Sequence, residues 1–342
     1  MNHIFLVKES RAGERRTALV PQDIAALVKQ GHTVSVESQS GLEAGYSDDD
    51  YRAVGANIVN IDQTNENSYK NAFAQAEIIV RAKRPNHQRE GLENRAINHG
   101  TIMIGALDPL ETGSNHIAEY NKAGIKAYSI DQADLPPTDP MNVLAAMSRL
   151  TGKLALQDAL SKHEESVHKV VIIGLGQVGK SALEEARHLN LPVSVIVSSD
   201  ANINQLEEQG IPTHFVDRTL PIEVQQTAIR SIISDADIVI TTARQAGQKA
   251  PLLIPSSTLD QMKPNAVIVD LPISEGGNVQ GSRHDETIIS DRGVKITNVS
   301  GYPKAMPKEA SILWSQASLQ FILRLSEGTE NLPLVTSYNQ GS

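Results

Sequence analysis

The chain has 342 residues, of which 40% are hydrophobic and 21% charged, a composition typical of a globular protein with more than one domain. Its formal net charge of -9 argues against nucleic acid or an anionic membrane surface as the main partner. The chain contains no cysteine, which excludes disulfides, thiolate catalysis and zinc–thiolate sites and is consistent with a reducing cytoplasm.

The N-terminal residues indicate a short strand, because residues 1–8 lack the longer apolar segment of a signal peptide. No stretch reaches the length of a membrane span, so we expect a cytoplasmic protein without direct membrane insertion. No His-x-x-x-His pair or acidic triad has the spacing of a metal site, and the acidic run 48–50 indicates a helix start. We therefore expect no metal.

Short β-branched segments and helical patterns alternate along the first part of the chain. A proline begins the helical pattern at 21–30, and Ser47 precedes a second one at 48–55. Residues 60–70 are polar and indicate a loop. This alternation predicts one α/β unit. The segments expected to form its strands are 4–7, 33–37, 78–80, 101–104 and 125–129.

A proline-rich segment at 134–140 precedes a long helical pattern that runs from Met141 to Leu160 and would connect two units. The second unit is expected to be a parallel, doubly wound sheet. The final apolar-striped helix, at 309–327, could pack on the first unit or cap its own sheet. The β segments of the second unit are 170–173, 193–197, 213–216, 238–242, 266–269 and 294–297.

The most informative motif is a G-x-G-x-x-G loop formed by Gly174, Gly176 and Gly179, with a β-branched run before it and a helical pattern after it. The first glycine permits the turn, the second lets backbone N–H groups approach a pyrophosphate, and the third lets helix and strand pack closely. Gln177 and Val178 begin the helix, where a negative group is favoured. The motif predicts a dinucleotide site; the alternative is a structural turn.

The strand after this loop lacks the acidic residue that usually bonds the adenosine ribose, because Val197 stands in its place. Val197 removes a charge that would repel a ribose 2′-phosphate, and Ser198 and Ser199 could donate hydrogen bonds to it. Alternatively, Asp200 reaches back to the ribose and the cofactor is NAD. We therefore expect NAD or NADP, and the pattern leans toward tolerance of NADP.

Two further loops follow strands of the second unit. Thr242 and Ala243 are small and follow one strand, while Asp270 precedes a loop with two glycines, Gly276 and Gly277. Such folds bind ligands at the carboxyl ends of their strands, so we expect Thr242, Ala243 and Asp270 at the cofactor. The alternative is that both loops are structural.

Several segments match a known family in order and spacing: 8–9, 16–21, 41–55, 147–152, 236–251, 262–277 and 303–307. In these segments the chain resembles the alanine dehydrogenase/transhydrogenase alpha-subunit family over nearly its whole length. The resemblance implies an α/β fold of two Rossmann-like domains with parallel, doubly wound sheets, joined by long helices. It implies a catalytic domain at 1–140 plus 299–342 and an NAD(P)-binding domain at 141–298. It also implies a cofactor contact at Ser148 and a homo-oligomer, either a dimer or a hexamer.

In the dehydrogenases of this family, an arginine and a lysine hold the carboxylate and the oxo group of the substrate. The matching positions are Arg16 and Lys83. An arginine can orient a carboxylate through two hydrogen bonds, and an ammonium can polarise the carbonyl that accepts hydride. The alternative is that both residues form surface ion pairs.

Two positions depart from the dehydrogenase pattern. Asp108 stands near the position of the family's histidine general acid/base, and Ser274 replaces an aspartate. Asp108 could carry a proton near neutral pH only if burial raised its pKa. Otherwise it could pair with a cationic group of the substrate or serve as a turn residue. We expect Arg16, Lys83 and Asp108 to be catalytic, with Arg16, Lys83 and Ser274 contacting a small-molecule substrate.

Three functions therefore remain open. The first is an NAD(P)-dependent oxidoreductase that transfers hydride between nicotinamide and an amino acid, or a 2-oxo acid with an amine. The second is a soluble, NAD-binding alpha subunit of a proton-translocating NAD(P) transhydrogenase. The partner-contacting loop of that class matches Pro137, Asp139 and Asn142 here and is not preserved. The third is a non-catalytic nucleotide-binding protein.

Overall fold

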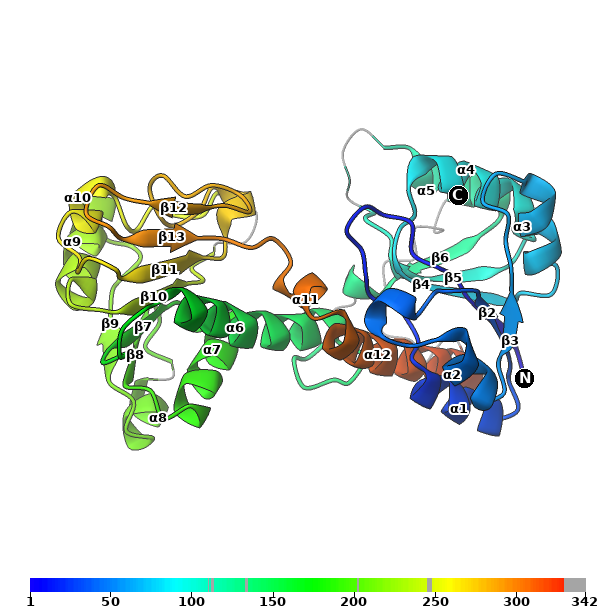
Figure 1. Ribbon diagram of the computed structural model, residues 1–342, viewed down its shortest axis with the longest axis horizontal. Helices are drawn as coiled ribbons and strands as arrows, with labels where there is room; N and C mark the ends of the chain where they lie inside the picture. Colours follow the sequence, from blue (N-terminus) through cyan, green and yellow to red (C-terminus); the bar gives the residue numbers. More distant parts are fainter. Residues whose placement is uncertain (110, 112–113, 133–134, 202, 245–247, 329–342) are drawn as a thin grey trace. The chain divides into compact units, whose positions relative to one another are not determined.

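The computed structural model describes residues 1–109, 111, 114–132, 135–201, 203–244 and 248–328. The chain divides into two compact units, each built around its own sheet (Figure 1). Among the described residues, unit 1 contains 1–147 and 303–328, and unit 2 contains 148–302. The sequence-based boundaries, after residues 140 and 298, both lie slightly before these junctions.

Unit 1 holds a six-stranded, wholly parallel sheet with the order β3-β2-β1-β4-β5-β6. The direction of winding reverses between β1 and β4, which is the doubly wound Rossmann order. A crevice opens at such a reversal outside the carboxyl ends of the strands. The strands are β1 (His3–Leu6), β2 (Thr33–Glu37), β3 (Asn57–Val59), β4 (Ile78–Lys83), β5 (Ile102–Ala106) and β6 (Lys126–Ser129).

The expectation of a loop at 60–70 is wrong for its second half, because α3 begins at Glu66. Asn65 caps this helix by accepting a hydrogen bond from the N–H of Asn67, 2.9 Å away. Tyr69 and Phe73 are its only buried residues, so the polar sequence concealed a helix with a narrow apolar face. The helices of unit 1 are α1 (Pro21–Lys29), α2 (Asp48–Ala53), α3 (Glu66–Phe73), α4 (His87–Ala96), α5 (His116–Ala123) and α12 (Pro307–Glu327), with short 3-10 turns η1 (Leu42–Ala44) and η2 (Ile130–Gln132).

The last described helix, α12, returns to unit 1 and lies beside α1 (Figure 1). Ser311 and Ser315 accept hydrogen bonds from the backbone N–H groups of Thr17 and Val20, each at 2.9 Å. This arrangement decides between the two placements that the sequence left open. The segment after β1 is therefore held from one side by a helix that is distant in sequence.

A buried ion-pair network joins β2, β4 and α4. Glu93 accepts hydrogen bonds from Arg81 at 2.7 Å and from Arg89 at 2.6 Å, and Arg89 also bonds Glu37 at 2.6 Å. Charged groups this deeply buried are retained only when each carboxylate has a cationic partner. The network fixes the strand β4, which ends at the candidate site.

Unit 2 holds a seven-stranded sheet with the order β12-β13-β11-β10-β7-β8-β9. The six strands expected in this unit are all parallel, and the structure adds a seventh, β12, which runs antiparallel to β13 at one edge. A short turn joins these two strands, and only an antiparallel pair permits so short a connection. The strands are β7 (Val170–Ile173), β8 (Val193–Val197), β9 (Thr213–Phe215), β10 (Ile238–Thr241), β11 (Val267–Asp270), β12 (Thr287–Ile289) and β13 (Lys295–Thr297).

The helices of unit 2 cover both faces of this sheet (Figure 1). A core cluster that includes Val171, Val239 and Ile268 lies against one face. No helix in the described ranges is both long and apolar enough to cross a membrane. The helices are α6 (Val143–Lys162), which spans the boundary between the units, α7 (Gln177–His188), α8 (Ile203–Glu208), α9 (Ile222–Ile233) and α10 (Ser256–Leu259), with the 3-10 turn η3 (Ile273–Glu275); α11 (Tyr302–Ala305) follows β13.

Candidate active site

Lys83 and Asp108 meet at the carboxyl edge of the sheet of unit 1. Lys83 ends β4, Asp108 follows β5, and Lys83 Nζ lies 3.4 Å from Asp108 Oδ1. The pairing between β4 and β5 shifts register between Val80 and Lys83. Such irregularities re-aim a side chain at the end of a strand. Two residues that the sequence proposed for the site are thus brought together.

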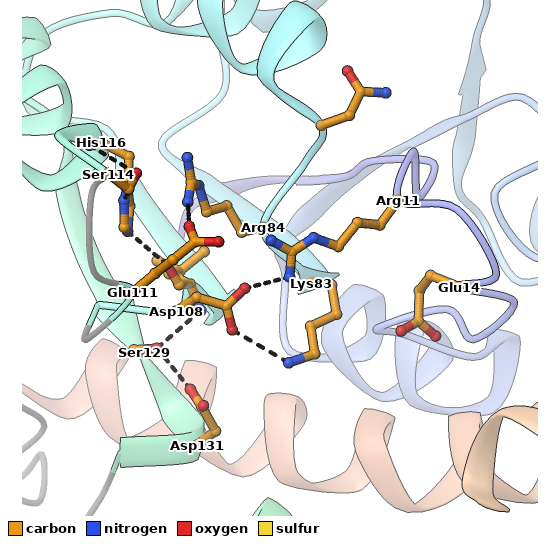
Figure 2. A network of polar contacts seen from close by, with 12 residues as sticks. Arg11, Glu14, Lys83, Arg84, Asp108, Glu111, Ser114, His116, Ser129 and Asp131 are labelled. Carbon is orange, nitrogen blue, oxygen red and sulfur yellow. Dashed lines mark hydrogen bonds and ion pairs between the residues drawn. The ribbon is translucent and has the colours of Figure 1, made fainter. Parts of the chain in front are cut away.

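Asp108 has a second cationic partner, Arg11, whose Nη1 donates to Asp108 Oδ2. Figure 2 shows Arg11 and Lys83 approaching this carboxylate, one at each oxygen. Burial acts to raise the pKa of Asp108, but the charges of Lys83 and Arg11 outweigh it and hold the pKa below its usual range. The condition for Asp108 as a proton carrier near neutral pH is therefore not met.

The backbone before Asp108 is clamped on both sides. The N–H of Leu107 donates to Ser129 Oγ at 2.9 Å, and its carbonyl accepts from His116 Nε2 at 3.0 Å. Burial lowers the pKa of His116, so a neutral ring donates this hydrogen bond. Asp108 itself adopts a positive φ of 50°, which is uncommon for a residue with a side chain. The carboxylate is therefore positioned by its own backbone as well as by its partners.

Arg16 lies in a different environment from the one that the sequence proposed. Its Nε and Nη2 bond the two carboxylate oxygens of Glu14 at 2.7 and 2.6 Å, and the two side chains are only 6% and 2% exposed. Its guanidinium lies 4.8 Å from the centroid of the Trp314 ring on α12. Among the contacts of the described residues, none joins Arg16 to Lys83 or Asp108.

Glu9 also belongs to this edge, although no catalytic or binding role was predicted for it. Its carboxylate accepts hydrogen bonds from the N–H groups of Ala82 at 2.6 Å and Lys83 at 3.0 Å. Burial raises the pKa of Glu9 to about 7, against the opposing charge of Arg81 and these two hydrogen bonds. The only sequence signal for this contact was the position of Glu9 shortly after the first strand. That position becomes informative once β1 is known to pair with β4, which brings Glu9 close to the end of β4.

A third cation at this edge, Arg84, is already neutralised. Its Nε and Nη2 form a fork with Glu90 at 2.7 and 2.6 Å, and its Nη1 pairs with Glu111. Tyr120 donates a further hydrogen bond to Glu90 at 2.5 Å. Arg84 is 2% exposed, whereas Lys83 is 27% exposed. The accessible positive charge at this edge therefore comes from residues other than Arg84.

The glycine loop of unit 2 has the geometry that its motif predicts. Gly174 has a φ of 91°, and a Cβ on Gly179 would lie 2.0 Å from the carbonyl oxygen of Gly174, so neither position tolerates a side chain. A Cβ on Gly176 would meet nothing within 4 Å. Thr242 Oγ1 donates to the carbonyl of Gly174 at 2.9 Å and braces the turn. The open side of the loop is therefore at Gly176.

The start of α7 is suited to a negative group. Its N-cap is Gly176, no side chain caps the helix, and its first turn, which includes Gln177 and Val178, contains no acidic residue. Val197 is buried at the end of the neighbouring strand β8, and Ser198 and Ser199 after it are exposed. These residues fit a dinucleotide whose pyrophosphate lies at the helix start and whose ribose lies beyond β8.

Asp270 lies at the end of β11 and is bonded within its own unit. Its side chain is fully buried and accepts hydrogen bonds from the N–H of Asn278 at 2.9 Å and from Thr241 Oγ1 at 3.0 Å. Burial raises the pKa of Asp270, with these hydrogen bonds acting in the opposite direction. The side chain of this residue holds the loop after β11 in place, and its expected contact with the cofactor stays a prediction. Ser274 is exposed on the same loop, in η3.

The remaining expected cofactor residues lie near the glycine loop or its supports. The N–H of Ala243 is bonded to Asn278 Oδ1 at 3.2 Å. Ser148 is half-buried on α6, one turn before Gly152. A Cβ on Gly152 would lie 2.1 Å from the carbonyl oxygen of Val178, so α6 packs closely on the start of α7. Ser148 therefore belongs to the helix that supports the loop.

The doubly wound sheet of unit 2, with its open glycine loop at a helix start, defines a dinucleotide-binding protein, and unit 1 adds a charged site on a second doubly wound sheet. The chain belongs to the alanine dehydrogenase/PNT family. The family model described as "Alanine dehydrogenase/PNT, N-terminal domain" matches residues 5–151, and that of the C-terminal domain matches residues 159–337.

Individual relatives carry two different names. The chain is 27% identical to an NAD(P) transhydrogenase subunit alpha of Rickettsia prowazekii, over 96% of this chain and 91% of the relative. It is 28% identical to an alanine dehydrogenase of Staphylococcus saprophyticus, over 94% of this chain and 87% of the relative. The solved structure of a transhydrogenase from Sinorhizobium meliloti is similar with a TM-score of 0.82 and 25% identity, covering 98% of both chains.

Proposed function

We propose that the protein is an NAD(P)-dependent oxidoreductase of the alanine dehydrogenase type, which transfers hydride between nicotinamide and an amino acid or a 2-oxo acid. The observation that carries this proposal is the cluster of Lys83 and Asp108 at the carboxyl edge of unit 1. This edge is where doubly wound sheets bind ligands. Relatives named alanine dehydrogenase and the dinucleotide geometry of the glycine loop support it.

Lys83, Asp108 and Gly176 each have a separate role in this proposal. Through its ammonium group, Lys83 orients the substrate and polarises its carbonyl for attack by ammonia. Loss of water then gives an imine, whose carbon accepts the hydride. Ionised Asp108 holds Lys83 in place and accepts a hydrogen bond from the amine of the substrate. Gly176 and the start of α7 hold the dinucleotide, which supplies the hydride when it is bound. Because Asp108 stays ionised, protons are exchanged with water rather than with this carboxyl group.

The test is a spectrophotometric assay of the purified protein. NADH and NADPH are each offered with pyruvate and other 2-oxo acids, with and without ammonia. We expect oxidation of the cofactor that requires the oxo acid and the amine, and we expect Lys83→Ala to lower kcat by at least about 100-fold. Full activity of Lys83→Ala would contradict the assignment of the site, and no turnover with any oxo acid would contradict the proposed function.

A second candidate is the alpha subunit of an NAD(P) transhydrogenase. Relatives of that name favour it. So does Asp108, which stands near the position where the dehydrogenases of the family have a histidine. The segment that matches the partner-contacting loop is engaged within the chain, because Asp139 pairs with Arg324 at 3.3 Å and Asn142 donates to the carbonyl of Leu135 at 2.8 Å. Hydride exchange between nucleotides on addition of an NADP-binding subunit would identify this function.

A further inference from the structure

We propose that Arg11, and not Arg16, binds the carboxylate of the substrate in this chain. The inference rests on the proposed function, since it names a binding residue for the same site. The resemblance between sequences assigns this role to Arg16. The contacts of the two arginines in the folded chain reverse the assignment.

Arg16 has little capacity left for a ligand. Two of its guanidinium nitrogens are bonded to the carboxylate oxygens of Glu14, and the third, Nη1, points at Met147 Sδ at 3.5 Å. One face of the guanidinium lies over Trp314. A substrate carboxylate would have to displace Glu14, which is 2% exposed and would then be a buried, unpaired charge. Separating a buried pair in this way is strongly unfavourable.

Arg11 is placed differently. Its side chain is 36% exposed, and Nη1 bonds Asp108. Within the described part of the chain, its Nε and Nη2 have no side-chain partner. Arg11 can therefore keep its bond to Asp108 and offer its remaining N–H groups to a carboxylate. The two oxygens of a carboxylate match the spacing of two guanidinium donors.

A tight turn between Arg11 and Arg16 directs the two side chains to different partners. The N–H of Glu14 donates to the carbonyl of Arg11 at 3.0 Å, which closes a turn with Gly13 at a φ of 74°. Figure 2 shows the two ends of this turn, with Arg11 directed at Asp108 and Glu14 lying apart from it. The turn thus directs Arg11 to the site and leaves Glu14 to pair with Arg16.

Charge at the site points to the class of ligand. Arg11 and Lys83 are held by opposite oxygens of one carboxylate, Asp108, so this cluster has one positive charge in excess. Arg84, the next cation along the chain, pairs with two carboxylates, Glu90 and Glu111, and adds no positive charge to the cluster of Arg11, Lys83 and Asp108. A small monocarboxylate matches the excess charge. In an amino acid, the amine would then lie within reach of Asp108.

The experiment compares Arg11→Gln with a charge-neutral variant of the other pair, Glu14→Gln/Arg16→Gln. The double variant leaves no unpaired buried charge, so it can fold. The measured quantities are kcat, KM for pyruvate, KM for the cofactor and the melting temperature. We expect Arg11→Gln to raise KM for pyruvate by roughly 10- to 100-fold, the loss expected for charged hydrogen bonds. In the double variant, KM for pyruvate should stay within about threefold of the wild-type value.

Two further measurements separate binding from positioning. Added guanidinium ion should restore part of the pyruvate affinity of Arg11→Ala, and KM for the cofactor should not change. A normal KM for pyruvate in Arg11→Gln, or a loss confined to the double variant, would overturn the proposal. If the wild type turns over no oxo acid, calorimetry with pyruvate and cofactor-loaded protein replaces the assay. Binding that depends on Arg11 would then support this inference although the proposed function had failed, and binding independent of Arg11 would overturn it.

Discussion

Two glycines of one loop have opposite surroundings, and this difference predicts opposite effects of the same substitution. A Cβ on Gly176 meets open space, whereas a Cβ on Gly179 lies 2.0 Å from a backbone oxygen. We expect Gly176→Ala to keep the melting temperature within a few degrees and to weaken NADH binding by at least about tenfold, because the methyl group occupies the approach to the pyrophosphate. Thermal melts and NADH fluorescence titrations measure both quantities.

Gly179→Ala is the matched comparison. The methyl group has no space beside Gly174, so we expect a loss of stability of about 1–3 kcal/mol, the usual cost of forcing extra volume into a packed region. Unchanged NADH affinity in a stable Gly176→Ala protein would show that the loop is a structural turn and not a dinucleotide site.

Arg16 and Asp108 show what a match of residue types cannot reveal. The sequence placed an arginine and a carboxylate near the right strands, but it could not show which cation each carboxylate would pair with. Glu14 is two residues from Arg16 and forms an ion pair with it. Arg11 lies five positions earlier and reaches Asp108 instead, since a tight turn reverses the chain between them. Pairing over this range is decided by the turn.

At the scale of elements, α12 is held to unit 1 by hydrogen bonds as well as by apolar contacts. Ser315 accepts from the N–H of Val20 and donates to Asp23, and all three residues are buried. We expect Ser315→Ala to lower the free energy of unfolding by about 1–3 kcal/mol, because a buried N–H loses its acceptor. Urea unfolding monitored by circular dichroism measures the change.

Ser318 on the same helix is the control. Its side chain is fully buried, and its hydroxyl has no hydrogen-bond partner among the described residues. Ser318→Ala should therefore leave the free energy of unfolding within about 0.5 kcal/mol of the wild type, or raise it, since removal of an unpaired buried hydroxyl costs nothing. Equal losses in both variants would mean that packing, and not hydrogen bonding, attaches α12.

Elements also differ in how much of them the sequence could predict. The buried strands β1, β7, β10 and β11 are continuous apolar runs, and all four were expected near their observed positions. The helix α4 was not expected. Its buried residues include Arg89, Glu90 and Glu93, whose partners come from other elements, so no apolar stripe marks it.

At the scale of the whole molecule, stability should depend on pH through Glu9. The folded chain raises the pKa of this carboxyl group from about 4.5 to about 7, so the folded state holds its proton more tightly than the unfolded state. The resulting stabilisation is complete below the lower value and is lost as the pH rises to the higher one. We expect the free energy of unfolding to fall over this range.

Glu9→Gln removes the titration and serves as the reference. Urea unfolding of both proteins across the same pH range should show a steeper decline in the wild type, with no difference in slope above the higher pKa. Parallel profiles would mean that Glu9 titrates alike in the folded and unfolded states, which would contradict the raised pKa of this carboxyl group.

The sequence by itself determined the α/β class, the two units and the dinucleotide loop, because these depend on local patterns: apolar runs, helical periodicity and glycines at fixed spacing. Only the tertiary structure decided that α12 packs on unit 1, that β12 runs antiparallel, that Asp270 holds a loop, and that Arg11 pairs with Asp108. Those features depend on which distant groups become neighbours once the sheets have formed. Pairing of charges and hydrogen bonds across such distances is decided by geometry and burial, which leave no periodic signal in the chain.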